Sequence, residues 1–420
     1  MRAVLITFFI SFTYILCEKA RFDYYRVYSI EIENDDQLQV MQDLENHQDG
    51  LLFLTLPIAN QTMVDILVPP HKFSDIGELF QKYEMKNKIK IENLQSLIDE
   101  EQSDGASSRA AFGWNRYNTL KEINDWMDEM LRQYPSVLTN YDIGRSYEKR
   151  TIRALKLSTR PELKNPIIFV ESTVHAREWI TAATATYLLN ALLTASVSRP
   201  QDPEITPLAM NYDWVFVPVV NPDGYVYSHT NNRMWRKNRR PQSNWCVGVD
   251  GNRNFGFYHA QSGGSKDPCS ELYGGAKAFS EPETFALSEF VKNFNISLYL
   301  SFHSYGQMLL FPYGHSKKRS GNYKDLMEIG LKSAQAIKKR FGTIYEVGPT
   351  SEVLYIASGT SADWVYAKRN VSLSYIFEFR DVRNGRNGFI LPPKQIIPNA
   401  LEVIDGLKVM IKEANLRGYL

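Results

Sequence analysis

Residues 166–179, P-I-I-F-V-E-S-T-V-H-A-R-E-W, contain the pattern that says most about how this chain folds. Residues 167–170 form a short continuous apolar run, which is typical of a strand buried on both faces. The chain then turns polar and presents His175 and, three residues later, Glu178. Because sites in open α/β sheets gather at the carboxyl ends of strands, the pattern predicts a buried strand that ends at a functional site.

The pair His175 and Glu178 suggests a metal site. An imidazole and a carboxylate at this spacing can point at one cation, and Zn²⁺ accepts such a mixed nitrogen and oxygen set. The alternative is an exposed polar turn in which Glu178 pairs with Arg177, and the short H-x-x-E pattern alone leaves both open. His303 ends the apolar run 296–302, so it also lies at the end of a predicted strand, although a buried, hydrogen-bonded histidine would look the same.

Composition describes an ordinary globular protein. The chain has 420 residues, 44% of them hydrophobic and 23% charged, which is enough for two or three domains with a large core. The net charge of +1 gives no basic field that would attract nucleic acid. We therefore expect neither a nucleic-acid partner nor a membrane protein, and we expect a monomer.

The N-terminus predicts secretion. Residues 1–17 combine Arg2 with an apolar run, the pattern of a cleaved signal peptide, and no later stretch is expected to span a membrane. Removal of this leader discards Cys17 and leaves Cys246 and Cys269. An even pair of cysteines in an oxidising compartment predicts one disulfide.

Residues 18–109 predict a small separate unit. Apolar alternation and helical periodicity give the order βαββαβ, that of a ferredoxin-like α+β module, with strands expected at 24–32, 51–56, 63–68 and 88–91. The unit ends in the small, polar linker 103–109, and Arg109 suits cleavage by a trypsin-like protease. A plain spacer between domains is the alternative.

Charge favours a removable prosegment. Residues 18–109 hold 18 acidic and 9 basic residues, a net charge of −9, whereas residues 110–420 hold 29 acidic and 38 basic residues, a net charge of +9. Opposite charges favour docking of the two parts, so we expect an acidic cap over a basic cleft.

Residues 110–420 predict an α/β fold. A helix opens at Asn118 or Thr119, and further helices are expected at 181–193, 281–294, 323–341 and 395–416. Strands are expected at 152–157, 167–170, 215–220, 296–302, 345–347 and 375–379. Alternating strands and helices predict a mixed, mainly parallel twisted sheet flanked by helices.

Six short motifs occur in this second unit. They are H-A-R-E-W at His175, R-M-W-R-K at Arg233, C-V-G-V-D-G-N-R-N at Cys246, S-F-H-S-Y-G-Q at Ser301, L-Y-x-A-S-G-x-S-x-D-W at Leu354 and F-E-F-R-D at Phe377. In this order and spacing the chain closely resembles the secreted zinc metallocarboxypeptidases of the digestive A/B type, as proenzymes. The resemblance covers nearly everything after the leader, prosegment included, and it implies peptide and protein C-termini as substrates.

The resemblance implies a role for each matching residue. His175, Glu178 and His303 match the zinc ligands, with an open position for water, and Asp250 matches a carboxylate that orients the first histidine. Glu378 matches the general base and Arg236 the residue that stabilises the oxyanion. The substrate's terminal carboxylate is matched by Asn252 and Arg253, with Tyr355 closing over it and Arg177 along its approach. Cys246 and Cys269 match the family's disulfide.

The pocket for the C-terminal side chain maps by resemblance to Gly314, Thr350, Ala362 and Ile376. Relatives that prefer Lys or Arg place an aspartate where this chain has Ala362, so we expect a preference for aromatic and aliphatic C-terminal residues. Thr350, the small Ala362 and the bulky Ile376 depart from the usual A-type wall and leave the ranking among apolar residues open.

Two other functions were weighed. A catalytically silent relative that binds peptide ends with zinc would usually lack Glu178, Glu378 or Arg236, and all three are present. A serine hydrolase would need a G-x-S-x-G nucleophile elbow, which the sequence does not contain.

Overall fold

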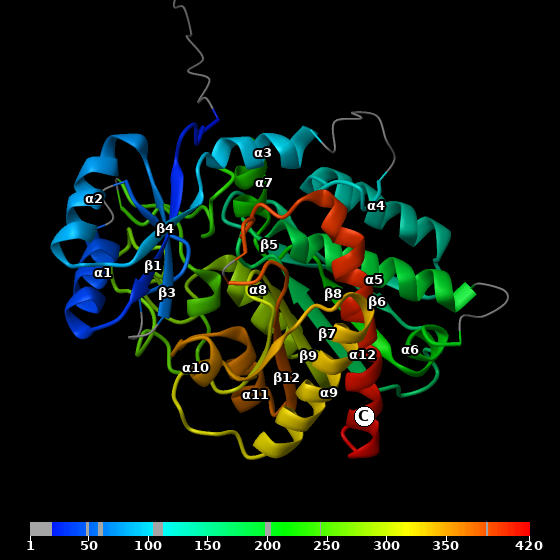
Figure 1. The fold of residues 1–420 in the computed structure, drawn as a ribbon. Helices are drawn as coiled ribbons and strands as arrows, with labels where there is room; N and C mark the ends of the chain where they lie inside the picture. Colours follow the sequence, from blue (N-terminus) through cyan, green and yellow to red (C-terminus); the bar gives the residue numbers. More distant parts are fainter. Residues whose placement is uncertain are drawn as a thin grey trace, which may run out of the picture.

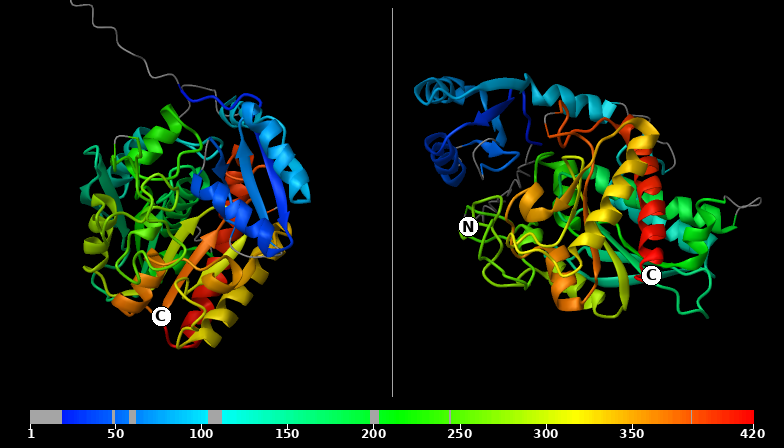
Figure 2. Two further views of the ribbon diagram at one scale, coloured as in Figure 1. Left: turned by 90° about the vertical axis from the view of Figure 1, so that its left-hand side faces the viewer. Right: turned by 60° about the horizontal axis from the view of Figure 1, so that its bottom comes forward.

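The computed structural model of the chain describes residues 19–47, 50–57, 62–103, 112–197, 203–243, 245–383 and 385–420 (Figure 1). The predicted leader and the predicted cleavage site at Arg109 lie outside these ranges. A small unit packs against one side of a larger one, as the two further views confirm (Figure 2).

The small unit has the predicted order βαββαβ. Its elements are β1 (Arg26–Ile32), α1 (Asp35–His47), β2 (Leu52–Phe53), β3 (Thr62–Val68), α2 (Phe73–Lys82), β4 (Asn87–Ile91) and a further helix, α3 (Leu94–Ser103). The strands form an antiparallel sheet in the order β2-β3-β1-β4. This is the ferredoxin-like arrangement, and its bounds within the chain, 18–109, stay a prediction.

The larger unit is built on an eight-stranded sheet in the order β11-β10-β12-β9-β7-β8-β6-β5. The strands are β5 (Leu138–Arg145), β6 (Thr151–Leu157), β7 (Ile167–Ser172), β8 (Asp213–Val217), β9 (Ile296–His303), β10 (Met308–Phe311), β11 (Glu346–Pro349) and β12 (Leu373–Glu378). The central run β8-β7-β9-β12 is parallel, as is the pair β10-β11, and the other pairs are antiparallel. The predicted mixed, mainly parallel sheet is confirmed.

Helices cover both faces of this sheet (Figure 1). They are α4 (Leu120–Gln133), α5 (Trp179–Val197), α6 (Thr206–Asn211), α7 (Pro222–Thr230), α8 (Pro282–Val291), α9 (Tyr323–Phe341), α10 (Thr350–Val353), α11 (Ser361–Arg369) and α12 (Ile396–Leu416). Side chains of β7 alternate between the two cores: Ile168 and Val170 pack with α5, α9 and α12, whereas Phe169 packs with α8 and α11. Thr119 caps α4 in a capping box with Glu122, at one of the two predicted starts.

Helix α5 corrects one expectation. Trp179–Val197 is long and apolar enough to cross a membrane, although no stretch after the leader was expected to be. Of its most apolar window, 67% is buried inside the protein, and its side chains are apolar all round because the helix lies in the core.

Several short elements were not predicted from the sequence. These are β5, β10, α6, α7, α10 and α11. His229 lies on α7, one of these elements, and its ring stacks on Trp179 with the centroids 3.8 Å apart.

The two units share an apolar interface. One face of the small sheet covers its own helices, and the other face, with α3, packs against the larger unit. The apolar cluster between the units contains Phe22, Val27, Leu67, Ile91, Leu94, Leu97 and Ile98 from the small unit and Met234, Tyr305, Phe389 and Ile390 from the larger one. Docking therefore rests on apolar burial as well as on charge.

A buried ion pair crosses this interface. Arg233 donates from Nε and one terminal nitrogen to the two carboxylate oxygens of Glu101, at 2.7 and 2.9 Å, and both side chains are 1% exposed. The guanidinium also lies 3.7 Å from the centre of the Trp179 ring. Such a two-pronged pair fixes α3 on the larger unit.

We expect Glu101→Gln to lower the free energy of unfolding of the whole chain by about 3 kcal/mol, because it leaves the Arg233 charge buried without an ionic partner. Urea unfolding measures the change. Glu78→Gln, on the exposed face of α2, removes the same charge and should shift stability by about 0.5 kcal/mol or less. Equal stability of the two variants would show that the pair does not hold the units together.

Candidate active site and metal centre

The predicted site residues meet at one edge of the large sheet. Strands β7, β9 and β12 are neighbours and parallel, so their carboxyl ends share that edge. His303 is the last residue of β9, and Glu378 is the last residue of β12 and its register partner. His175 and Glu178 follow β7 in the turn before α5.

A strained turn brings His175 and Glu178 across the edge. Thr173 adopts a φ of 58°, which is rare for a β-branched residue and costs of order 1–3 kcal/mol. Its hydroxyl donates to the carbonyl of Pro218 at 3.0 Å and contacts the hydroxyl of Thr181 at 2.9 Å, so the surrounding structure holds the turn.

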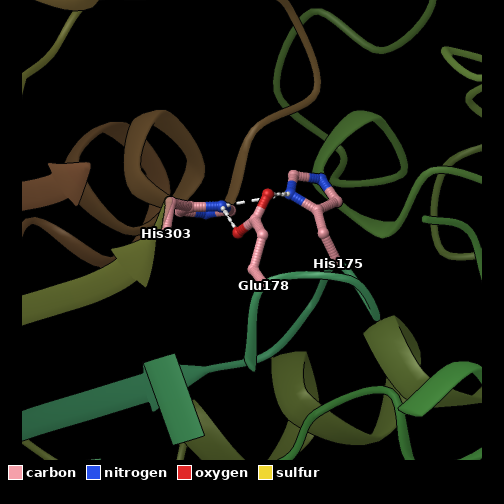
Figure 3. A group of neighbouring side chains, drawn as sticks. All are labelled: His175, Glu178 and His303. Carbon is pink, nitrogen blue, oxygen red and sulfur yellow. Dashed lines mark hydrogen bonds and ion pairs between the residues drawn. The ribbon is translucent and has the colours of Figure 1, made fainter. Parts of the chain in front are cut away.

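His175, Glu178 and His303 converge on one point (Figure 3). Glu178 lies between the two rings, with Oε1 2.8 Å from His175 Nδ1 and Oε2 3.2 Å from His303 Nδ1. The two Nδ1 atoms are 3.1 Å apart, and all candidate ligand atoms lie within 4.8 Å of one another. All three side chains are buried.

The donor set fits zinc. Burial alone would lower the pKa of His303, but the Glu178 carboxylate outweighs it and raises this pKa to about 9. Burial raises the pKa of Glu178, whereas the two histidines lower it by more, so the carboxyl is held ionised. Two imidazoles and one carboxylate form an established ligand set for a catalytic zinc ion.

Asp250 orients the first histidine. Its Oδ1 lies 3.0 Å from His175 Nε2, which turns Nδ1 toward the shared point. Arg236 donates to the other oxygen, Oδ2, at 2.8 and 3.2 Å. Burial opposes ionisation of Asp250, but Arg236 and His175 hold its pKa well below the usual range. This carboxylate supports a metal ligand in the usual way.

A cavity of about 370 Å³ opens over the metal group. Arg236 and Glu378 line it together with His175, Glu178 and His303. Burial raises the pKa of the Glu378 carboxyl to about 8, the nearby Glu178 adds to this rise, and His303 opposes it. A value near neutral suits a group that must accept a proton and return it.

The small unit covers the same cavity. Five of its residues line the cavity beside the metal group, and these are Phe53, Leu54, Thr55, Leu56 and Met63. Lys90 donates to the backbone carbonyl of Arg383 at 2.9 Å, and the hydroxyl of Tyr305 donates to Asp65 at 3.2 Å. The small unit thus forms part of the wall of the cavity over the metal group.

Two predicted substrate residues, Asn252 and Arg253, follow Asp250 in a short 3-10 turn. Arg253 donates to the carbonyls of Gly263 and Asn252, at 2.7 and 2.9 Å, and to the hydroxyl of Tyr355 at 3.0 Å. Its guanidinium is therefore fixed in direction before any ligand arrives. Asn252 Nδ2 lies 3.2 Å from His303 Nε2, which places the carboxylate-binding pair next to the metal group.

Arg177 lines the cavity as well. Its guanidinium lies 4.2 Å from the centre of the Phe389 ring, and one terminal nitrogen contacts Glu271 at 3.3 Å. Burial lowers the pKa of Arg177 to about 10, and Glu271 opposes this shift. The exposed turn considered from the sequence, with Glu178 paired to Arg177, does not form: both side chains are buried, and Glu178 faces the histidines.

The predicted pocket wall has two layers. Thr350 and Ile376 line the cavity, whereas Gly314 and Ala362 lie behind it. Ala362 is fully buried in an apolar cluster with Met308 and Ile376. At Gly314, a Cβ would lie 3.3 Å from Thr350 Cγ2 and 2.9 Å from a backbone carbonyl, so only glycine allows this close approach.

Several lining residues were not predicted from the sequence. These are Glu271, Leu272, Ser304, Tyr305, Met308, Leu310, Leu354, Ala357, Thr360, Arg383 and Phe389. Ser304, Tyr305, Leu354 and Ala357 lie at specified positions of the quoted motifs, so the motifs carried a signal for them. The predicted disulfide between Cys246 and Cys269 is present, with 4.7 Å between the Cα atoms, and it closes the segment that carries Asp250, Asn252 and Arg253.

Comparison with known proteins supports the same assignment. Residues 123–406 match the family model of the zinc carboxypeptidases, and residues 28–101 match that of the carboxypeptidase activation peptide. The chain is 40% identical over 406 residues to zinc carboxypeptidase A 1 of Anopheles gambiae, covering 96% of this chain and 92% of that one. It is 36% identical over 397 residues to carboxypeptidase A1 of Bos taurus, covering 92% and 93%.

Solved structures agree. Carboxypeptidase A from Helicoverpa armigera superposes with a TM-score of 0.85 at 29% identity, covering 94% of this chain and 99% of that one. The thrombin activatable fibrinolysis inhibitor gives a TM-score of 0.85 at 30% identity, covering 93% and 98%. The chain belongs to the zinc carboxypeptidase family, as the zymogen of a metallocarboxypeptidase that carries its own activation peptide.

Proposed function

We propose that the protein is secreted, acts as a monomer, and removes aromatic or aliphatic residues from the C-termini of peptides and proteins after its prosegment has been cut off. One observation carries the proposal: the fixed guanidinium of Arg253 and the carboxamide of Asn252 line the same cavity as the metal group. We propose the roles of the site residues as well as the preference for apolar C-terminal residues.

Each group of side chains around the cavity has a separate role in the proposed reaction. His175, Glu178 and His303 would hold a zinc ion, and the chemistry it would supply there is a lowered pKa of water, to about 7, and polarisation of a carbonyl. Glu378 takes a proton from the attacking water and returns it to the leaving amine. Arg236 donates to the oxygen that becomes negatively charged as the carbonyl is attacked, and losing one such donor costs about 2.7–4 kcal/mol of transition-state stabilisation.

Restriction to chain ends follows from Arg253. A guanidinium forms a forked pair with a carboxylate, and an internal peptide bond offers none. Asn252 adds a donor to the same group, Tyr355 already lies at the guanidinium, and Arg177 lines the approach. A substrate without a free C-terminus leaves these buried donors unpaired, which opposes its binding.

The pocket favours apolar side chains. Leu310, Ile376 and Leu354 line it, with Thr350 as a polar exception. Ala362 lies one layer deeper, in an apolar cluster with Met308, Leu310 and Ile376. A Lys or Arg side chain entering here would lose water without gaining an ionic partner.

A catalytically silent relative would differ from the enzyme only in the residues needed for the reaction itself. A relative that only binds peptide ends needs the metal group and Arg253 but neither Glu378 nor Arg236. Both of these line the cavity beside the metal group, which favours an active enzyme.

Activation by cleavage after Arg109, by a trypsin-like protease, completes the proposal. The prosegment lines the cavity, so peptide access requires its removal. The disulfide and the leader predicted at residues 1–17 support secretion.

Glu378→Gln should keep zinc and still bind peptide, because the amide occupies the same space, but kcat should fall by about 10²–10⁴-fold because the amide accepts no proton. Zinc content by atomic absorption and single-turnover hydrolysis of a C-terminal Phe peptide measure this. Glu346→Gln, an exposed carboxylate on β11 of the same sheet, serves as the control. Hydrolysis by Glu378→Gln at the control rate would reject the base assignment.

The trimmed enzyme should hydrolyse peptides ending in Phe or Leu with a kcat/KM roughly 100-fold or more above that for peptides ending in Lys. Ile376→Ala enlarges the lining and should raise the ratio of Phe to Val by about tenfold. Ile344→Ala, at a side chain that is 63% exposed, should leave the ratio unchanged. A wild-type preference for Lys would contradict the assigned specificity.

Trypsin should release activity together with a new N-terminus at Ala110. Arg109→Gln should stay inactive for longer under the same treatment, because the bond that trypsin recognises is gone, and Arg21→Gln should activate like the wild type. Peptide hydrolysis and N-terminal sequencing follow the course. Full activity of the uncut chain would refute the role of the prosegment.

A further inference from the structure

Glu171 is a buried carboxylate with no part in the proposed reaction. It lies on β7, four residues before His175, and is 1% exposed. Its Oε1 accepts hydrogen bonds from the hydroxyls of Ser301, Ser361 and Tyr299, the latter two at 3.0 and 3.3 Å. Its Oε2 has no hydrogen-bond partner within the described part of the chain.

Burying a carboxyl group costs free energy unless hydrogen bonds compensate for it. The groups that contact Glu171 therefore indicate which parts of the structure it positions. No guanidinium or ammonium pairs with Glu171 among the described ion pairs. Its Oε1 instead accepts from three hydroxyls, one of them that of Ser361, the first residue of α11. Glu171 thereby links β7 and β9 to the start of α11.

Ser361 carries this link on to the carboxylate-binding pair. While its hydroxyl donates to Glu171, its backbone N–H donates to Asn252 Oδ1 at 3.0 Å. The backbone N–H of Asn252 donates to Asp250 Oδ1 at 2.9 Å. With its oxygen held by Ser361, the Asn252 carboxamide directs its NH₂ group to the opposite side, where Nδ2 lies 3.2 Å from His303 Nε2 at the lining of the cavity.

We propose that Glu171 is a positioning residue for recognition of the substrate's terminal carboxylate: it fixes Ser361, and Ser361 fixes the donor direction of Asn252. The inference rests on the proposed role of Asn252. The donor direction of Asn252 is then set by Glu171, two side chains away, on the strand β7 that also leads to the metal group.

The trimmed enzyme provides the test. Glu171→Gln replaces the carboxyl group by an amide, and Ser361→Ala keeps the backbone donor but removes the hydrogen bond to Glu171. Both should raise KM for a C-terminal Phe peptide, by about tenfold and about threefold, with kcat within about twofold of the wild type, since about 1.4 and about 0.7 kcal/mol of carboxylate binding are lost. The double variant should be no worse than Glu171→Gln alone, because both changes break one path.

A binding measurement separates this proposal from the proposed function. Calorimetry with 3-phenylpropanoate, which offers a carboxylate and an apolar ring but no peptide bond, should show Kd raised by the same factors. If the wild type bound this probe but hydrolysed no peptide, the proposed function would fail while the Kd comparison would still test Glu171.

Ser301→Ala is the matched control. It removes a hydroxyl from the same carboxylate oxygen, and no hydrogen bond joins Ser301 to Ser361 among the described contacts, so a purely structural role for the cluster predicts similar effects in Ser301→Ala and Ser361→Ala. We expect Ser301→Ala to change the urea midpoint but neither KM nor Kd. Unchanged KM and Kd in Ser361→Ala, or a loss of zinc or of kcat in its place, would overturn the proposal, and this holds even if Glu171→Gln does not fold.

Discussion

The register of three parallel strands is the constraint on which the site depends. β7, β9 and β12 end at one edge, and His303 and Glu378 are direct register partners there. Because side chains alternate along a strand, a slip of one residue would turn either group to the opposite face of the sheet. The apolar cores on both faces hold this register, so packing far from the cavity determines whether the metal group and the base meet.

The same two-sided burial explains how the prosegment docks. In the small sheet, Tyr28 and Ile30 face its own helices and Val27 faces the larger unit. Charge alone predicted an acidic cap over a basic cleft, yet the interface is an apolar cluster with the buried pair of Glu101 and Arg233. Opposite net charge favours the encounter of the units, whereas apolar burial and the buried ion pair stabilise the docked state.

Much of the fold and site could be predicted, for identifiable reasons. The strands that lead to His175, His303 and Glu378 are mostly apolar, and the motifs place each residue at or just after a strand end. Helix α7 was missed because Pro222 and Gly224 look like a turn, although Asn221 caps the helix and proline suits its first position. β10 is only four residues long. The two layers of the pocket wall depend on packing between α11 and β12, which no local pattern encodes.

The carboxylate-binding pair shows what the protein gains from groups buried around the cavity. Arg253 is held by two carbonyls and a tyrosine hydroxyl, and Asn252 by the backbone of Ser361 and by Asp250. None of these contacts involves substrate, so the donors are already ordered when the chain folds. Substrate binding therefore does not have to supply the entropy cost of ordering them. Asp250 serves both halves of the site at once, through His175 on one side and Asn252 on the other. A displacement of this one carboxylate would therefore misalign the metal group and the proposed carboxylate-binding pair together, and under the proposed function it would couple where a peptide is held to where it is cut.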